Sequence, residues 1–382
     1  MKNTPRLRFP NFYDKWESDY LKNVSKVYDG THQTPKYVDE GVPFYSVETL
    51  TSNDFLKTKY ISEEVYEKEI KRVKIESGDI LMTRIGDIGT SKLVTWDKPC
   101  SLYVSLALIK KSKQHASGFL KFLFDSKFFQ SQLWQKTLHV AYPKKINLGE
   151  LNTCKVLTPS ISEQQKIADF LTAVDKRIEL LENKKNLLET YKKGVMKKIF
   201  NQEIRFKDDN GSDFPYWEEK KLGDITNKKS SNISANSIES NEGNYTIYGA
   251  TGELKEVDFF EMNTPYISIV KDGSGVGRVK LCKPYSSVLG TLDIITNNET
   301  SDLNFIYQFL TKTSFLKFVT GSSIPHIYYK DYSKLKLSVP SIKEQEKISK
   351  FMSSIDSQIE LLVTQIDKSK TWKKGLLQKM FV

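Results

Sequence analysis

Apolar residues at alternating steps of three and four mark two long stretches of the chain, one after Pro159 and one after Pro340. This spacing is typical of the seam of a coiled coil, and each stretch predicts a helix of about 35 residues, roughly 50 Å long. Such a stripe needs a partner helix, and we expect each stretch to pair with the other. The alternative is two unrelated amphipathic helices, each packed on its own domain. The expected pairing residues are Ile167, Leu171, Val174, Ile178, Leu181, Leu188, Ile348, Met352, Ile355, Ile359, Leu362 and Ile366.

The two stretches are copies of one another. Residues 159–200 begin PSISEQQKIADF and residues 340–381 begin PSIKEQEKISKF, and nearly half of the aligned positions are identical without a gap. Self-similarity of this extent indicates an internal duplication. The copies are not equivalent, because Lys185 interrupts the first seam where the second has Ile366.

Each copy opens with a motif that resembles a helix start. Ser160 is followed three residues later by Glu163, and Ser341 by Glu344. This spacing predicts a capping box, in which each side chain satisfies a backbone N–H of the first helical turn.

The duplication divides the chain into four parts. We expect a first domain at 1–158, a central helix at 159–200, a second domain at 201–339 and a C-terminal helix at 340–382. The segments that open the two domains, residues 3–22 and 203–222, also match, since Leu-Arg-Phe at 7–9 corresponds to Ile-Arg-Phe at 204–206. We call these two segments the lead segments. The pattern predicts an α/β (α+β) protein with pseudo-two-fold symmetry.

Between lead segment and helix, each domain holds an insert of common plan but divergent sequence. Strand-like runs and glycine-containing turns precede one helical stretch, at 118–138 in the first insert and 304–319 in the second. A polar turn and a short strand are then expected to lead into the long helix, at 142–146 and 324–327. The other expected strands lie at 43–47, 79–83, 244–248, 264–270 and 288–295.

Charge and cysteine content favour a cytoplasmic protein that binds an acidic partner. The net charge of +11 favours an acidic partner such as nucleic acid, although residues 201–339 are slightly acidic by themselves. Three cysteines without CxxC spacing predict reduced thiols in a cytoplasmic protein. The N-terminus has no signal-peptide pattern, and no apolar run approaches the ~20 residues that span a membrane.

We call the lead segments and the two long helices together the frame. This duplicated frame, the PSIxEQxKI motifs and the divergent inserts resemble the specificity (S) subunit of type I restriction–modification enzymes. GDILMTRIGDIG at 78–89 is similar to the strand–turn–strand of a target recognition domain, and VKDGSGVGRVKL at 270–281 occupies the corresponding place. The resemblance implies two α/β target recognition domains separated and oriented by two long antiparallel coiled-coil helices. It also implies a bipartite, asymmetric target in double-stranded DNA, with each half read by one domain.

The same resemblance implies partners. Two methyltransferase (M) subunits would dock on the polar outer face of the frame, and restriction-motor (R) subunits would join the complex. S-adenosylmethionine, ATP and Mg²⁺ would be bound by these partner subunits, and no cofactor by this chain. The length of the helices is expected to set the spacing between the two half-sites.

Polar side chains in the turns are the candidate DNA contacts. Gln and Thr suit adenine and thymine edges, Arg suits guanine or phosphate, and Lys suits phosphate. The alternatives are an ordinary surface turn at 28–35, a structural salt bridge for Arg84, solvated lysines and hydrogen-bonded surface histidines. The candidates are Thr31, His32, Gln33, Thr34, Arg84, Lys144, Lys145, Tyr248, Thr251, Lys271, Ser274, Arg278, Ser322, Ser323 and His326.

No motif in the sequence indicates catalysis. The adenine-methyltransferase Asn-Pro-Pro-Tyr/Phe, Walker A, HExxH and GxSxG motifs are absent, and neither His32 nor His326 has neighbours with metal-ligand spacing. The glycine-rich stretch at 271–278 precedes a strand-like run, so it predicts a hairpin and not a nucleotide-binding loop. The sequence therefore predicts a non-catalytic DNA specificity subunit. The alternatives are a coiled-coil protein–protein scaffold with peptide- or protein-binding inserts and, thirdly, a free-standing nuclease.

Overall fold

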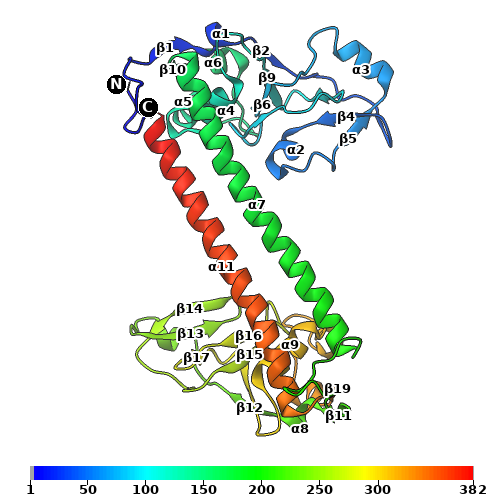
Figure 1. The fold of residues 1–382 in the computed structure, drawn as a ribbon. Coiled ribbons are helices and arrows are strands. Elements are labelled where there is room, and N and C mark those ends of the chain that lie inside the picture. Colours follow the sequence, from blue (N-terminus) through cyan, green and yellow to red (C-terminus); the bar gives the residue numbers. More distant parts are fainter. Residues whose placement is uncertain (1–3, 382) are drawn as a thin grey trace. The chain divides into compact units, whose positions relative to one another are not determined.

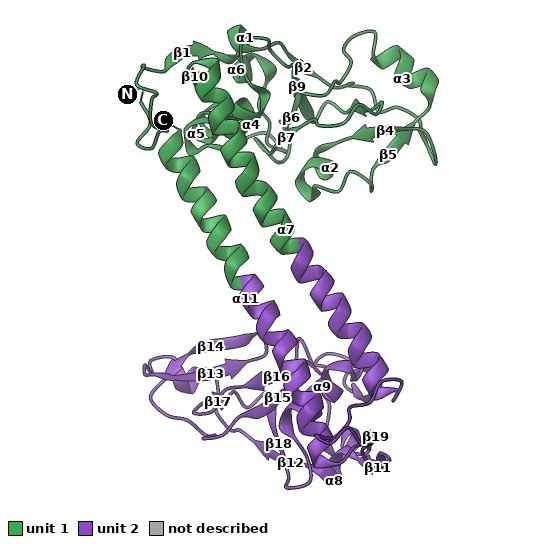
Figure 2. Cartoon of the chain, in the orientation of Figure 1, with its two compact units in different colours: residues 1–182, 364–382 green, residues 183–363 purple. Residues whose placement is uncertain are grey.

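The computed structural model describes residues 4–381 and divides into two compact units (Figure 2). Unit 1 comprises residues 1–182 and 364–382, and unit 2 comprises residues 183–363. Each unit contains one insert together with part of both long helices. Figure 1 shows the fold and labels its elements where there is room.

The two long helices are α7 (Ile161–Phe200) and α11 (Ile342–Met380), each somewhat longer than the sequence indicated. In unit 1 they are joined by ion pairs of Lys370 with Glu182 (2.7 Å) and Lys373 with Asp175 (2.6 Å). Position numbers fall along α7 as they rise along α11, so the helices are antiparallel. This confirms the predicted pairing.

In unit 2 the same helices are joined by Lys192 and Asp356, whose side chains lie 2.5 Å apart. The apolar seam of α11 is buried at Ile366, whereas the seam of α7 is only half-buried at the matching Lys185. Lys185 forms an ion pair with Glu189 of its own helix at 3.0 Å. Leu181, Leu188 and Ile359 are half-buried, and the remaining seam residues are buried: Ile167, Leu171, Val174, Ile178, Ile348, Met352, Ile355, Leu362 and Ile366.

The insert of unit 1 is built on two small sheets. Helix α4 (Ser117–Asp125) covers the first, and its Phe119 packs with Trp16 and Ile167 in the main core. The first sheet has the order β2 (Val27–Asp29), β9 (Leu106–Ile109), β6 (Ile80–Thr83), β7 (Ser91–Leu93). The second has the order β3 (Tyr37–Val38), β5 (Lys59–Ile61), β4 (Val42–Tyr45), β8 (Ser101–Leu102).

The insert of unit 2 repeats this topology, except that its second sheet has no counterpart of β3 among the described residues, so the duplication extends beyond the frame. Its helix α9 (Leu303–Lys312) takes the place of α4. The first sheet has the order β12 (Thr226–Ser230), β18 (Leu292–Asn297), β15 (Tyr266–Val270), β16 (Val279–Cys282). The second has the order β14 (Gly252–Val257), β13 (Tyr245–Gly249), β17 (Ser287–Val288), and in both units its last two strands run parallel.

An antiparallel strand pair ties each lead segment to its long helix. Strand β1 (Glu17–Tyr20) pairs with β10 (Lys155–Thr158), and β11 (Glu218–Lys221) pairs with β19 (Lys336–Val339). The strands that enter the long helices are therefore β10 and β19. The prediction of strands at 142–146 and 324–327 is wrong, because these segments form loop bridges that precede α6 (Leu148–Asn152) and α10 (Tyr329–Tyr332).

The predicted helical stretches are also interrupted. The first breaks at Ser126, whose Oγ accepts the N–H of Phe129 (3.3 Å) and starts a second helix, α5 (Lys127–Lys136). A serine that can cap a helix favours a new start over continuation. The second stretch ends as α9 at Lys312 and is followed by a short 3₁₀ turn, Leu316–Phe318.

The duplicated glutamate binds an arginine of its lead segment. Glu163, with 1% of its side chain exposed, accepts two hydrogen bonds from Arg8 at 2.8 and 2.6 Å. Glu344 accepts two from Arg205 at 3.2 and 2.7 Å. The predicted capping boxes are therefore wrong: the carboxylates are taken by arginines, and the Oγ of Ser341 is buried without a partner among residues 4–381.

The neighbouring glutamine holds the helix of the insert. Gln164 donates to the carbonyl of the proline that opens its motif (2.9 Å) and accepts the backbone N–H of Ala116, which caps α4 (3.0 Å). Gln345 makes the same two contacts in unit 2, the second with Asp302 at the start of α9 (2.9 Å). The EQ pair thus joins lead segment, long helix and insert in both units.

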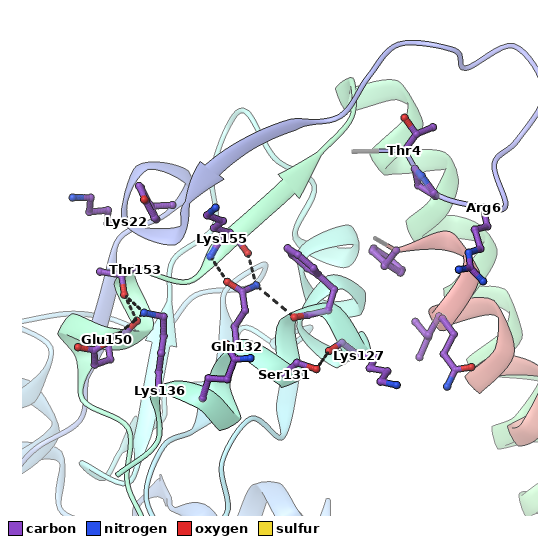
Figure 3. Close-up of a pocket in the computed structure, with 17 residues that line it drawn as sticks. Thr4, Arg6, Lys22, Lys127, Ser131, Gln132, Lys136, Glu150, Thr153 and Lys155 are labelled. Atoms are coloured by element: carbon purple, nitrogen blue, oxygen red, sulfur yellow. Dashed lines mark hydrogen bonds and ion pairs between the residues drawn. The ribbon is translucent and has the colours of Figure 1, made fainter. Parts of the chain in front are cut away.

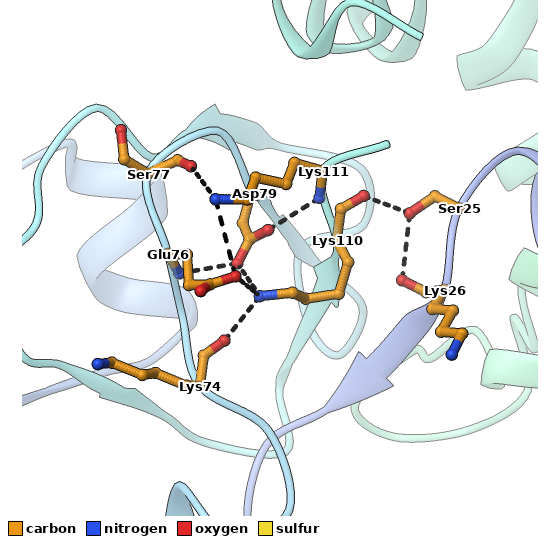
Figure 4. Close-up of polar contacts among 8 residues, drawn as sticks. All are labelled: Ser25, Lys26, Lys74, Glu76, Ser77, Asp79, Lys110 and Lys111. Carbon is orange, nitrogen blue, oxygen red and sulfur yellow. Dashed lines mark hydrogen bonds and ion pairs between the residues drawn. The ribbon is translucent and has the colours of Figure 1, made fainter. Parts of the chain in front are cut away.

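A buried carboxylate fixes one end of the β6–β9 pair in unit 1. Figure 4 shows Asp79 bonded to the ammonium of Lys110 (2.6 Å) and to the backbone N–H groups of Glu76 and Lys111 (both 2.8 Å). Every oxygen of this carboxylate has a donor, so its burial is compensated. The cluster is structural, and it orients β6 toward the loop that follows Thr83.

Candidate nucleic-acid interface

Three loops of unit 1 are held side by side by hydrogen bonds. The Thr31 carbonyl accepts the N–H of Val104 (3.0 Å), and the Val104 carbonyl accepts Nη1 of Arg84 (2.7 Å). The N–H of Gly86 donates to the Lys144 carbonyl at 2.8 Å. The fold therefore brings the first seven candidate residues of the sequence together, with six of them on one face, which we call the unit 1 loop face, and Arg84 beneath it. Its loops span residues 30–36, 84–90 and 138–145.

The first loop is anchored by a buried aspartate. Asp29 forms ion pairs with Arg72 and with His32, whose Nε2 lies 2.8 Å from the carboxylate. Burial by itself would raise the pKa of Asp29, but the hydrogen bonds from Arg72 and His32 outweigh it and hold the pKa below its usual value. His32, Gln33 and Thr34 are exposed beyond this anchor.

Arg84 is more deeply placed than the sequence suggested. Only 7% of it is exposed, and burial lowers the pKa of its guanidinium, although Asp29 opposes the effect. Among residues 4–381 it forms no ion pair with a carboxylate, so the salt-bridge alternative is not what the structure shows. Its Nη1 supports the Val104 carbonyl, while its Nε has no partner among the described residues. Arg84 thus shapes the loop face from beneath.

Lys144 and Lys145 are exposed, and the backbone of each is fixed. Lys145 bridges both Ile85 and Leu138, which ties the third loop to the second. Ammonium groups held on a rigid backbone but free in solvent can meet phosphates without specifying bases.

In unit 2 the predicted hairpin is confirmed. Strands β15 and β16 pair through Ile269 and Val279, and residues 271–278 form the turn between them. Gly277 lies in the left-handed region, and an added Cβ would meet Phe315 at 2.6 Å, so this glycine lets the turn pack closely. Ser274 and Arg278 are exposed, and Arg278 donates to the carbonyl of Ala250.

The other unit 2 candidates divide into exposed and buried. Thr251, Ser322 and Ser323 are exposed, and His326 is half-buried with its ring 5.3 Å from that of Tyr328. Tyr248 is only 1% exposed because β13 turns its side chain into the core. Its hydroxyl lies beside the N–H of Lys283 (3.5 Å), and the fold accounts for it as a core residue.

The unit 2 loops at residues 249–252, 271–278 and 320–326 are joined in the same way, and we call them the unit 2 loop face. Backbone contacts align the two loop faces. The N–H of Ile146 donates to the Arg84 carbonyl (2.9 Å), and the N–H of Ile327 donates to the Lys271 carbonyl (2.9 Å). Arg84 therefore occupies the position of Lys271. By the same correspondence, the pair Lys144–Lys145 is matched by Pro325–His326 in unit 2. The faces share a backbone plan but differ in charge and in side-chain chemistry.

One carboxylate near the unit 2 loop face was not foreseen. Asp293 is buried, and its oxygen lies 3.3 Å from Lys228 and 3.6 Å from Lys271. Its other oxygen accepts the hydroxyl of Tyr332 at 3.3 Å. Lys271 is thus partly neutralised, which makes it a weaker anion contact than its sequence context implied. No local pattern signals this pairing, because Asp293 lies on a neighbouring strand.

A separate hollow of about 1340 Å³ lies on the frame of unit 1, outside the loop face (Figure 3). The lead segment, α5, β10 and the end of α11 line it. Among the described residues that line it, Glu150 is the single acidic one, and it is paired with Lys136 at 3.2 Å. Its remaining charged side chains are basic: Arg6, Lys22, Lys127 and Lys155.

The structure adds three general findings. Within residues 4–381, no group of three or more His, Cys, Asp or Glu side chains is arranged to hold a metal ion. No helix in that range is long and apolar enough to cross a membrane. All three cysteines are free and buried.

A duplicated frame that carries two inserts of one topology, each ending in a different set of loops, defines a two-domain recognition protein. The family model described as the type I restriction modification DNA specificity domain matches residues 13–190 and 216–369. The chain belongs to this family and is a specificity subunit of the type I restriction–modification class.

Relatives and solved structures agree along the whole chain. The putative type I restriction enzyme MjaX specificity subunit of Methanocaldococcus jannaschii is 25% identical, over 98% of this chain and 95% of that protein. The MjaIX specificity subunit of the same organism is 23% identical, over 96% and 92%. The type I restriction–modification S subunit from M. genitalium shares the fold, with a TM-score of 0.70, 18% identity and 99% of each chain covered. A structure concerning complex assembly and conformational transition of the type I R-M system has a TM-score of 0.55, 14% identity and coverage of 97% and 98%.

Proposed function

We propose that each unit reads one half of a bipartite, asymmetric site in double-stranded DNA. The observation that carries this proposal is the pair of loop faces on one backbone plan with different side chains at equivalent positions. Arg84 of unit 1 is equivalent in position to Lys271 of unit 2, and the lysine pair at 144–145 is equivalent to Pro325–His326. Two readers of identical design but different chemistry suit two different sequences better than one repeated sequence.

The frame has a second role in this proposal. The helices α7 and α11 set the spacing of the half-sites, and methyltransferase subunits, two in number, dock on their polar outer faces. The basic hollow of Figure 3 offers these partners a concave surface on the frame of unit 1. Restriction-motor subunits join through the complex. The chain is non-catalytic, and S-adenosylmethionine, ATP and Mg²⁺ are bound by its partners in the cytoplasm.

Salt-titrated binding tests the proposal. The full chain, assembled with its methyltransferase partner, is titrated with a duplex that carries its methylated sequence and with a scrambled duplex of equal length. We expect preference for the intact site and an affinity that falls steeply with salt, because phosphate contacts release counterions. A flat salt response without sequence preference would support the protein–protein scaffold instead.

A further inference from the structure

One loop of unit 1 projects from a rigid base. Residues 139–144 connect Leu138 to Lys145, and the N–H of Leu138 donates to the Lys145 carbonyl at 2.8 Å. Lys145 also bridges Ile85, and Lys144 accepts the N–H of Gly86 at 2.8 Å. The base is therefore fixed from two sides, and the tip stands beyond it on the unit 1 loop face.

The tip presents apolar side chains to solvent. Val140 is 99% exposed and Tyr142 is 103% exposed, so no part of the described chain covers either of them. The exposed Trp134 lies at the foot of the loop, with the His139 ring 4.9 Å from its own and the His139 Nε2 2.8 Å from its carbonyl. Single exposed apolar residues are ordinary, but a contiguous group on a fixed loop marks a binding surface.

The surroundings of the tip indicate what covers it. Lys144 and Lys145 follow the tip directly in the chain and are exposed, and Lys127, also exposed, lines a hollow together with Trp134, His139 and Lys144. Among the described residues that line this hollow the one carboxylate is that of Asp87, and it accepts a hydrogen bond from the Thr83 hydroxyl at 2.8 Å. Exposed apolar side chains beside exposed cations match DNA, where wedge residues enter between base pairs while cations meet the phosphates.

The equivalent loop of unit 2 has a different tip. Its bridged ends are Thr320 and His326, and the residues between them are Gly-Ser-Ser-Ile-Pro. Only Ile324, at 64% exposed, is apolar and prominent, and no aromatic residue is present. The loop of unit 1 is also one residue longer. A wedge is therefore expected in one half-site and not in the other.

We propose that Val140 and Tyr142 insert between neighbouring base pairs of the half-site read by unit 1, while Lys144 and Lys145 contact the flanking phosphates. This inference rests on the proposed DNA-reading function and adds a local unstacking of the target. The half-site read by unit 1 is opened by the wedge as well as read at its base edges. Sequences with easily unstacked steps, such as TA or CA, are then favoured at the insertion point.

The test uses the full chain in complex with its methyltransferase partner. Duplexes of the methylated target carry 2-aminopurine at successive positions of both half-sites, excluding the methylated bases, which methyltransferases themselves extrude. We expect a fluorescence increase of several-fold at one step of one half-site. Tyr142→Ala and Val140→Ser should abolish it, and Tyr142→Ala should weaken target binding by roughly tenfold, as for loss of a stacked aromatic. Tyr13→Ala, which removes another exposed aromatic side chain of unit 1, should change neither the fluorescence increase nor the affinity for the target.

The other outcomes are decisive as well. Tight, sequence-specific binding without any fluorescence increase would overturn the wedge and leave the proposed function standing. Gel filtration of Tyr142→Ala tests whether the methyltransferase subunits still bind. If they no longer bind, and the variant still gives the wild-type increase in 2-aminopurine fluorescence, the tip is a protein contact and the wedge is overturned. A wild-type complex that binds the site no better than scrambled DNA would overturn both proposals.

Discussion

Arg8→Ala removes one partner of a buried ion pair that holds the lead segment to the long helix. The Glu163 carboxylate is 1% exposed, and both of its hydrogen bonds come from Arg8. Removing one partner of such a pair costs about 3–5 kcal/mol, since a charge is left buried without compensation. Arg8 is itself 11% exposed, so water can reach the vacated space and we expect about 3 kcal/mol, at the lower end of this range.

The matched change in unit 2 should cost less. After Arg205→Ala, the Glu344 carboxylate still accepts Nε1 of Trp217 at 3.1 Å, whereas Trp16 of unit 1 makes no such bond. A hydrogen bond to a charged group contributes about 1.5–3 kcal/mol. We therefore expect Arg8→Ala to destabilise its unit more than Arg205→Ala does, by about 1 kcal/mol or more.

Differential scanning calorimetry of the full chain measures the difference. For a unit of this size, about 3 kcal/mol corresponds to a fall in Tm of about 6–12 °C. Lys68→Ala, which breaks the exposed pair with Glu64, is the control and should shift Tm by no more than a few degrees. Replacing both buried partners, Arg8→Met with Glu163→Leu, should recover most of the loss. A fall in Tm for Arg8→Ala no larger than that for Lys68→Ala would show that the buried ion pair does not hold the lead segment to the helix.

Three further outcomes are expected. Inserting four helical residues after Glu182 and four after Val363 adds about 6 Å to each long helix. The preferred spacer between the half-sites should then grow by about two base pairs, while both half-sites stay the same. An unchanged spacer in methylome sequencing would contradict the spacing role of the helices. Lys144→Ala and Lys145→Ala should each lower the slope of log affinity against log salt by about 0.9 without changing the preferred sequence; an altered preference would make them base contacts. Because the pKa of Asp29 is lowered on folding, its ion pairs stabilise unit 1 above about pH 4 and this contribution is lost as pH falls further, so Asp29→Asn should flatten the acid side of Tm against pH. An equally steep acid side in that variant would exclude the carboxylate as the cause.

The frame was readable from the sequence because its signals are local or repeated. Steps of three and four from Ile167 onward report which face of the helix is buried. Two copies of one motif show that the same structure is built twice. The role of Glu163 was misread because its partner, Arg8, is 155 positions away in the chain. A capping box and a long-range ion pair leave the same local pattern.

The loop faces were only partly readable. The exposed turns were identified from glycine, serine and lysine content, and the fold joins them by backbone contacts that no spacing rule predicts. Tyr248 lies in a turn-rich stretch, yet the strand beneath it sends its side chain inward. Arg84 was expected to contact DNA or to form a salt bridge, and instead it is buried and donates to a backbone carbonyl. The exposure of Tyr142 and the pairing of Lys271 with Asp293 depend on neighbouring strands and loops, so only the tertiary structure reveals them.

If each insert reads its own half of the site, exchanging one insert should exchange one half-site. The experiment replaces residues 227–338 with the corresponding insert of a relative of different specificity. Methylome sequencing of a host that carries the chimera and the methyltransferase partner then gives the recognised sequence. We expect one half-site to change while the other half-site and the spacer remain. A change in both halves, or in neither, would contradict it.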